Sequence, residues 1–345
     1  MAQVVVLGAG SWGTTVAAIC ATKAPTVLWA RRAELVGAIR SSRRNADYLP
    51  DVELPLELEV TDSLEEAVGG ADVCIMAVPS HGFRQILHEA ARHLAPGACV
   101  VSLTKGLERD TLNRMTQIVG EEAPGRARGV LTGPNLAREV AAGQPTASVV
   151  SVDDPELAVV LQQLLSTESF RVYTNPDLVG CEIAGALKNV IAIGAGLADG
   201  MGFGDNSKAA LITRGLAELT RLGVAMGGDP LTFAGLAGMG DLIATCVSHQ
   251  SRNRHVGEQL GRGRTIEDIQ ADMNMVAEGV KTAPSVCRLA AEHGVEVPIA
   301  EQVVEVLEGR KSARQIIPAL MQREAKPELY GMRGVASASQ GTEDG

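Results

Sequence analysis

The chain has 345 residues, of which 46% are hydrophobic and 21% charged, and its formal net charge is −10. This length and composition suggest a folded protein of about two domains, and they exclude a disordered or a collagen-like chain. An acidic chain with 3% aromatic residues lacks the basic surface and the stacking side chains of a general nucleic-acid-binding protein, so we expect no nucleic-acid partner.

Short apolar runs alternate with amphipathic stretches over the first half of the chain. Runs rich in Val, Ile and Leu lie at 3–7, 26–30, 73–78, 98–103, 129–132 and 146–152, with a last one at 169–174. Helical patterns lie between them at 11–23, 33–41, 81–94, 111–120, 135–142 and 155–165. This alternation predicts an α/β Rossmann-like domain with a doubly wound parallel sheet over residues 1–176.

Long helical patterns replace the strand-like runs after about residue 175. They cover 177–199, 206–227, 251–260, 276–293, 299–308 and 312–322. The pattern predicts an all-α C-terminal domain over residues 177–332 and a disordered tail over 333–345. The most apolar stretch, 178–198, contains Glu182 and Lys188, so we expect no membrane span. No signal peptide is apparent, and we therefore expect a cytoplasmic protein.

Six cysteines are scattered through apolar surroundings, and none forms a Cys-x-x-Cys pair. We interpret them as small buried side chains in a protein from a reducing compartment. Cys246 and His249 have a spacing that would suit a metal ion, but no second pair accompanies them. We therefore predict no metal site.

A glycine fingerprint follows the first apolar run. Gly8, Gly10 and Gly13 form Gly-x-Gly-x-x-Gly, with Ser11 and Trp12 between the last two. In this position the glycines permit a tight turn, a close approach of pyrophosphate to the backbone, and packing of the following helix on the strand. The pattern predicts a dinucleotide site; the alternative is a glycine turn that serves packing alone.

The second strand ends at Arg31-Arg32 instead of at the carboxylate that a site specific for NAD places there. Guanidinium groups accept a ribose 2′-phosphate, whereas a carboxylate repels it. The pair therefore favours NADP(H), with NAD(H) used beside it; the alternative is a solvated basic pair that opens a helix.

Two lysines are candidates for the chemistry. Lys188 lies in an apolar helical segment, where burial and a second cation lower a lysine's pKa and make it a workable general acid and base. The alternative is a lysine whose amine reaches water. Lys105 lies in Ser-Leu-Thr-Lys-Gly after a strand, where ligands bind in open parallel sheets; alternatively it is a surface lysine in a turn.

Two polar segments of the second half are further candidates. Asp241 follows Gly-Met-Gly and is either a substrate ligand and partner of Lys188 or the N-cap of the next helix. Ser251-Arg252-Asn253 opens a helix, and a helix N-terminus with an arginine suits a phosphate group; the alternative is a solvated basic helix start. We interpret Arg254 as a solvated bystander.

Several segments together resemble NAD(P)-dependent glycerol-3-phosphate dehydrogenase of the bacterial type. In order, they are GAGSWGTT, LWARR, LTKGLE, GPNLA, GALKNVIAIGAGLADGMGFGDNSKAAL, GMGDL, SRNRHVGEQLG and VAEGVKTA. The resemblance implies reversible hydride transfer between NAD(P)H and dihydroxyacetone phosphate, which gives sn-glycerol 3-phosphate for phospholipid synthesis. It also implies that Lys188 is the catalytic general acid and base.

The resemblance implies a set of contacts. Those to the substrate would come from Lys105, Gly133, Asn135, Lys188, Asp241, Ser251, Arg252 and Asn253. Those to the cofactor would come from Gly8, Gly10, Ser11, Trp12, Gly13, Arg31, Arg32, Lys105, Ala137, Arg252, Val276 and Glu278. On physical grounds alone, Glu278 is a surface carboxylate before a glycine. This chain departs from the family at Asn135, where Ser or Thr is usual, and at His249-Gln250, where Pro-Leu is frequent.

Two other functions compete with this interpretation. One is a two-domain dehydrogenase for a different phosphorylated or carboxylated hydroxy compound. The other is a non-catalytic NAD(P)H-binding protein, which would have no need of Lys188, Lys105, Asp241 and Arg252 together. If the protein is a dehydrogenase, of this family or of the other kind, we expect a homodimer, the commonest assembly of soluble enzymes.

Overall fold

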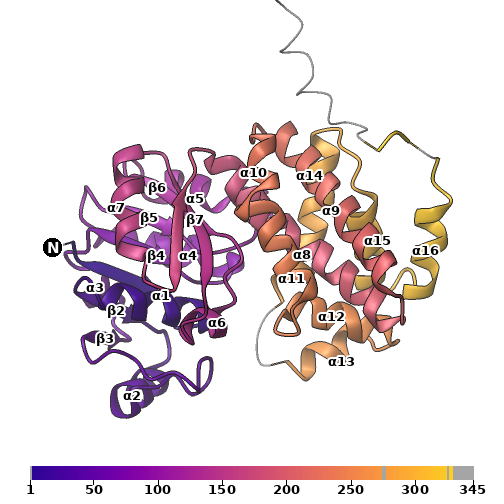
Figure 1. Ribbon diagram of the computed structural model, residues 1–345. Helices are drawn as coiled ribbons and strands as arrows, with labels where there is room; N and C mark the ends of the chain where they lie inside the picture. The colour runs from indigo at the N-terminus through magenta and orange to yellow at the C-terminus, as the bar shows by residue number, and fades with distance from the viewer. Residues whose placement is uncertain (1, 274–276, 325, 329–345) are drawn as a thin grey trace, which may run out of the picture.

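The structure is a computed structural model that describes residues 2–273, 277–324 and 326–328. Two lobes lie side by side, and Figure 1 shows the N-terminus at the outer end of the first. We call residues 2–174 the sheet lobe and the described residues from 178 onward the helical lobe. Val276 and the predicted tail over 333–345 lie outside the described residues.

One sheet of eight strands, in the order β3-β2-β1-β4-β5-β6-β7-β8, forms the centre of the sheet lobe. The strands are β1 (Val4–Leu7), β2 (Thr26–Trp29), β3 (Leu58–Thr61), β4 (Val73–Met76), β5 (Cys99–Ser102), β6 (Arg128–Thr132), β7 (Thr146–Val152) and β8 (Phe170–Thr174). The predicted Rossmann-like fold is confirmed, and the glycine fingerprint follows β1 at the centre of the sheet.

The predicted parallel sheet has one antiparallel pair, near one edge. Strand β7 runs antiparallel to β6, with Gly129 opposite Val152, and β8 runs parallel to β7. The connection before β7 contains only the short helix α6 (Ala137–Ala141). A parallel neighbour requires a crossover long enough to return the chain to the other end of the sheet, which this connection does not provide.

The sequence prediction also missed β3 and the helix that follows it, α3 (Leu64–Val68). Strand β3 lies at the edge of the sheet and pairs with β2 alone. Its Glu59 side chain is exposed while the residues beside it are buried. An edge strand with one polar position has no continuous apolar run, so the criterion that found the central strands fails here.

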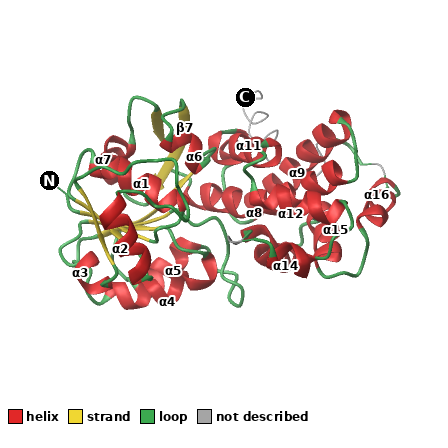
Figure 2. Ribbon diagram, turned by 90° about the horizontal axis from the view of Figure 1, so that it is seen from below, coloured by secondary structure: helices red, strands yellow, loops and turns green. Residues whose placement is uncertain are grey.

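Helices cover both faces of the sheet, as Figure 2 shows from below. Val4 and Val6 of β1 pack with α1 (Ser11–Ala21), α2 (Ala33–Ser42), α6 and α7 (Pro155–Leu165). Val5 and Leu7 pack on the opposite face with α3, α4 (Ser80–Ala91) and α5 (Met115–Glu122). Alternate residues of a strand point to opposite faces, so a strand covered on both sides is apolar throughout.

The helical lobe is built around α8 (Leu178–Gly200), which is buried along nearly its whole length. The elements that pack against it are α9 (Asp205–Ala225), α10 (Pro230–Ala234), the π-helix η1 (Leu236–Gly240), α11 (Asp241–Val247), α12 (Arg252–Gly261), α14 (Glu278–Glu292) and α15 (Pro298–Leu307). Two further helices lie outside this layer: α13 (Ile266–Ala271) packs on α12, and α16 (Ala313–Met321) packs on α15 and α12. Helix α8 is long and apolar enough to cross a membrane, but 89% of its most apolar window is buried in the protein. Within this structure it is the core helix of the lobe.

Helices α8 and α12 touch through their backbones. A Cβ on Gly196 of α8 would lie 2.0 Å from the carbonyl oxygen of Arg254, and a Cβ on Gly257 of α12 would lie 2.0 Å from that of Ile193. Only glycine permits this approach. The contact holds the start of α12, with its polar Ser-Arg-Asn segment, against the helix that carries Lys188.

Candidate active site

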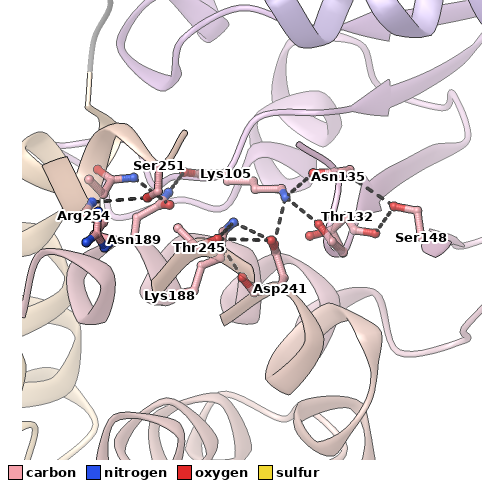
Figure 3. Close-up of polar contacts among 12 residues, drawn as sticks. Lys105, Thr132, Asn135, Ser148, Lys188, Asn189, Asp241, Thr245, Ser251 and Arg254 are labelled. Carbon is pink, nitrogen blue, oxygen red and sulfur yellow. Dashed lines mark hydrogen bonds and ion pairs between the residues drawn. The ribbon is translucent and has the colours of Figure 1, made fainter. Parts of the chain in front are cut away.

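Polar side chains from both lobes converge at the carboxyl edge of the sheet (Figure 3). Lys105 follows β5, and Gly133 and Asn135 follow β6. Lys188 comes from the middle of α8, and Asp241 is the first residue of α11. The carboxyl edge of an open parallel sheet is where ligands bind, so this convergence marks a candidate site.

The Asp241 carboxylate joins the two lysines. Its Oδ2 atom lies 2.8 Å from Nζ of Lys105, and its Oδ1 atom lies 2.5 Å from Nζ of Lys188. Asp241 is 2% exposed, so these charges face each other away from bulk water. Asp241 begins α11, but its side chain points to the lysines, and the alternative of an N-cap is wrong.

Lys105 is held by three oxygen atoms. Its Nζ donates to the Gly133 carbonyl at 3.0 Å, to Asn135 Oδ1 at 2.7 Å and to Asp241. Burial lowers the pKa of Lys105 to about 7; Asp241 opposes this change and the Lys188 ammonium adds to it. Lys105 therefore lies next to a second cation and has a pKa close to neutral pH. The alternative of a surface lysine in a turn is wrong.

Lys188 is buried, with only two hydrogen-bond acceptors on its amine in the described structure. Its Nζ donates to Asp241 Oδ1 and, at 2.6 Å, to the Thr245 hydroxyl. Thr245 lies one turn after Asp241 and donates its own proton to the Asp241 carbonyl. An ammonium group has three N–H donors, so Lys188 retains one for a further acceptor. A lysine whose amine reaches water does not describe this buried, paired group.

A relay of side-chain amides connects four segments beside the lysines. Asn189 of α8 donates to the Lys105 carbonyl at 3.2 Å, and Asn253 of α12 donates to Asn189 at 2.9 Å. The Oδ1 atom of Asn253 accepts from the Gly279 amide of α14 at 2.9 Å. The predicted ligand Asn253 thus also fixes α12 against α8 and α14.

The predicted phosphate segment opens α12. Ser251 is the N-cap, and its hydroxyl accepts from the Arg254 amide at 3.2 Å. Arg252 is exposed and makes no hydrogen bond or ion pair with the described residues, so its guanidinium is available to a ligand. Arg254 is not the solvated bystander that we expected: it is 6% exposed and pairs with Asp199 of α8 at 2.7 Å. Arg254 is two residues after Arg252, so it lies on a different face of α12, the face that packs against α8.

Asn135 has partners in the sheet lobe at the position where the family usually has Ser or Thr. Its amide nitrogen lies 3.4 Å from the Ser148 hydroxyl, which in turn donates to the Thr132 carbonyl at 2.7 Å. Its oxygen accepts from Lys105, so Asn135 braces that lysine against β7. Ala137, further along the same segment, accepts from Thr15 of α1 at 3.3 Å and lies beside the glycine fingerprint.

The glycine fingerprint fits a dinucleotide. Gly8 has φ of +119°, and a Cβ on Gly13 would lie 2.0 Å from the Gly8 carbonyl oxygen, so larger residues cannot form this turn. A Cβ on Gly10 would meet nothing within 4 Å, and no side chain caps α1 there. The uncapped amides of α1 are therefore open to a pyrophosphate. The Trp12 ring packs edge-on against Phe170, with 5.9 Å between centroids, which turns it into the core.

The remaining predicted cofactor residues come from both lobes. Arg31 and Arg32 follow β2 and are exposed, and Arg32 pairs with Asp47 at 2.5 Å. Glu278 begins α14, is partly buried and accepts from the Ser80 hydroxyl of α4 at 2.9 Å. It bridges the two lobes and is not the isolated surface carboxylate that its sequence context suggested.

Asn189, Thr245 and Ser148 are site residues that the sequence analysis did not single out. Asn189 is adjacent to Lys188 and Thr245 lies one turn after Asp241, which is the signal that could have identified them. All six cysteines are free and five are buried, as expected of small core side chains. Among the described residues, no three His, Cys, Asp or Glu side chains gather as a metal site would require.

Two family models match the chain, one in each half. The description "NAD-dependent glycerol-3-phosphate dehydrogenase N-terminus" matches residues 3–158, and the corresponding "C-terminus" matches residues 177–318.

Curated relatives match over nearly their full length. The chain is 55% identical to a glycerol-3-phosphate dehydrogenase [NAD(P)+] of Sphingopyxis alaskensis, over 95% of this chain and 98% of the relative. It is 52% identical to the enzyme of that name from Geobacter sulfurreducens, over 94% and 98%. The crystal structure of glycerol-3-phosphate dehydrogenase from Coxiella burnetii superposes with a TM-score of 0.90 at 34% identity, over 93% of this chain and 99% of that one.

Proposed function

This chain belongs to the NAD-dependent glycerol-3-phosphate dehydrogenase family, and from that premise we propose that it reduces dihydroxyacetone phosphate to sn-glycerol 3-phosphate with Lys188 as the general acid. It is an NAD(P)-dependent oxidoreductase. The observation that carries the proposal is the pair of lysines, one from each lobe, that share the buried Asp241 carboxylate.

The count of donors and acceptors divides the work between the two lysines. Lys105 uses its three N–H groups on three protein oxygens, whereas Lys188 uses two and keeps one. Lys188 is therefore the amine that can give a proton to the substrate carbonyl oxygen as negative charge develops there. Lys105 adds positive charge beside that oxygen and orients the substrate.

The reaction needs one hydride and one proton. A nicotinamide cofactor, when bound beside the glycine fingerprint, would supply the hydride for the carbonyl carbon. Lys188 delivers the proton to the oxygen in the reduction and removes it from the hydroxyl in the oxidation. Asp241 and Thr245 hold its amine through two N–H groups in both directions. The third position carries the transferable N–H in the reduction and the accepting lone pair in the oxidation.

The substrate phosphate would lie at the start of α12. Ser251 caps this ten-residue helix by accepting from the Arg254 amide, whereas the amides of Arg252 and Asn253 make no hydrogen bond with the described residues. Arg252 is the first residue of the helix, and its guanidinium has no ion-pair partner among the described residues. Asn253 fixes this terminus against α8 through Asn189. The amide relay thus fixes the start of α12 relative to the helix that carries Lys188.

We extend the proposal to the use of the product, the cellular compartment and the oligomeric state. The product supplies the glycerol phosphate backbone of phospholipids, and the buried free cysteines suit a cytoplasmic enzyme. We also infer a homodimer, because Met239, Ile243 and Val247 expose an apolar stripe at four-residue intervals along η1 and α11. Light scattering of the purified protein would show twice the chain mass, and a single-chain mass would refute the dimer.

The test is oxidation of NADPH and of NADH, followed by absorbance, with dihydroxyacetone phosphate as the substrate. We expect saturable turnover with both cofactors. The variant Arg252→Ala should raise KM for the phosphorylated substrate by about 100-fold, the size of one charge-assisted phosphate contact. Arg262→Ala, at the C-cap of the same helix, 57% exposed and paired with Glu258, is the matched control and should leave KM unchanged. Equal effects of the two variants, or no turnover with either cofactor, would refute the proposal.

A further inference from the structure

A short segment after α2 braces the glycine fingerprint from outside. Asn45 is fully buried, and its amide donates to the Ala9 carbonyl at 2.9 Å and to the Thr14 hydroxyl at 2.8 Å. Three residues later, the Tyr48 carbonyl accepts from the Ser11 hydroxyl at 2.8 Å. The backbone between Asn45 and Tyr48 is therefore fixed relative to the loop that would hold the pyrophosphate.

Asp47 lies inside this braced segment and faces the end of β2. Its carboxylate binds the Arg32 guanidinium at 2.5 Å, and the guanidinium lies 5.8 Å from the centre of the Tyr48 ring. Both side chains of the ion pair are about half exposed, at 50% and 49%. Arg31 is also exposed and makes no hydrogen bond or ion pair with the described residues. The two adjacent arginines thus differ in that Arg32 already has an anionic partner.

We propose that Asp47 sets the cofactor preference of this enzyme by holding Arg32 away from the ribose 2′-phosphate. The inference rests on the proposed recognition of NADPH by Arg31 and Arg32. Arg31 then contacts the 2′-phosphate directly, while Arg32 must leave Asp47 to do so. Asp47 in turn remains an acceptor for the ribose hydroxyls of NADH, the role that a carboxylate at the end of this strand plays in sites for NAD. One pair of residues thus allows both cofactors to bind.

The size of the effect follows from the exposure of the pair. A half-exposed ion pair contributes little free energy, so Arg32 can leave Asp47 at a small free-energy cost. Asp47 therefore competes only modestly with the 2′-phosphate for the guanidinium. Replacing Asp47 by Asn frees the guanidinium and removes a negative charge near the phosphate. We expect selectivity for the 2′-phosphate to rise two- to five-fold, whereas a buried pair would have blocked Arg32 altogether.

The experiment measures binding of adenosine 2′,5′-bisphosphate and of 5′-AMP by calorimetry, which needs neither turnover nor the nicotinamide. In Asp47→Asn, the ratio of the two dissociation constants should shift two- to five-fold towards the bisphosphate. An unchanged ratio, or a shift towards AMP, would overturn the proposal. The control is Glu53→Gln, which removes the same charge from the nearby exposed pair of Arg44 and Glu53 and should leave the ratio unchanged.

A second variant tests whether Asp47 acts through Arg32. In an Arg32→Ala background, Asp47→Asn should produce less than half of its effect on the ratio, because the competition has been removed. The full effect in that background would contradict the proposal. The kinetic ratio of kcat/KM for NADPH over NADH should follow the binding ratio in each variant. Failure to turn over dihydroxyacetone phosphate would refute the proposed reaction and leave the fragment-binding result standing.

Discussion

Asp241→Asn removes the carboxylate that both buried lysine amines contact, while it leaves the volume of the side chain almost unchanged. Each lysine lies within 2.8 Å of Asp241. At such distances one ion pair amounts to about 6 kcal/mol before desolvation, with an effective dielectric constant of about 20. Measured losses on breaking a buried pair are about 3–5 kcal/mol, and we expect a loss of about 3 kcal/mol at pH 8.

The loss should grow as the pH falls. Burial and the Lys188 ammonium set the pKa of Lys105 at about 7 against the pull of Asp241, so the variant lowers this pKa further. Below pH 7, folded wild-type protein takes up this proton and the variant does not. The gap in the free energy of unfolding therefore widens by about 1.4 kcal/mol for each pH unit below 7.

The assay is urea unfolding of both proteins at pH 8 and at pH 6, with kcat/KM measured beside it. We expect kcat/KM to fall at least about 100-fold, since the position of the general acid is lost. The control is Asp272→Asn, which breaks an exposed pair with Arg264 and should change stability by less than about 0.5 kcal/mol. A stability gap that is equal at the two pH values, or narrower at pH 6, would refute the shared-carboxylate reasoning.

Three further predictions concern stability. Wild-type stability should rise above pH 7, because unfolded Lys105 keeps a proton that the folded state has released, and Lys105→Met should flatten this rise in thermal unfolding; an unchanged slope would contradict the assignment. Burial raises the pKa of Glu218 to about 7, although its carboxylate accepts a hydrogen bond from the Ile299 amide. Between about pH 4.5 and 7 the folded protein therefore holds a proton that the unfolded chain lacks. The free energy of unfolding consequently falls as the pH rises through that range. The Tm of Glu218→Gln should therefore rise relative to the Tm of wild type between pH 5 and pH 8. A constant difference in Tm between the two proteins would argue against this. Gly257→Ala should cost about 3 kcal/mol in urea unfolding, because its Cβ would meet the Ile193 carbonyl at 2.0 Å, and a wild-type midpoint would disprove the backbone contact.

The central strands and the two lysines could be predicted because their signals are local. A buried parallel strand is apolar along its whole length, and a lysine within an apolar helix stands out in the sequence. Strand β3 escaped because an edge strand with Glu59 exposed resembles a polar loop. The antiparallel direction of β7 was not predicted, because an apolar run indicates a buried strand but not the direction in which the strand runs in the sheet.

The partners of the lysines could not be predicted, because the fold determines them. Nothing in the local sequence distinguishes Thr245 and Asn189 from other helical residues. Only the packing of α11 and α8 brings Thr245 to Lys188 and Asn189 to the Lys105 carbonyl. Arg252 and Arg254 are two positions apart on one helix and are equivalent as residue types. Only the contact between α12 and α8 turns Arg254 towards Asp199 and leaves Arg252 free among the described residues.

The most direct test of the assignment of Lys188 is chemical rescue of Lys188→Ala. The variant leaves Asp241 Oδ1 and the Thr245 hydroxyl in place, so a small amine can occupy the position of the missing Nζ. Turnover of dihydroxyacetone phosphate with NADPH should fall at least about 1000-fold and recover saturably as methylamine is added, while tetramethylammonium, which has no N–H, should restore nothing. Turnover within ten-fold of wild type without any amine would contradict Lys188 as the proton donor.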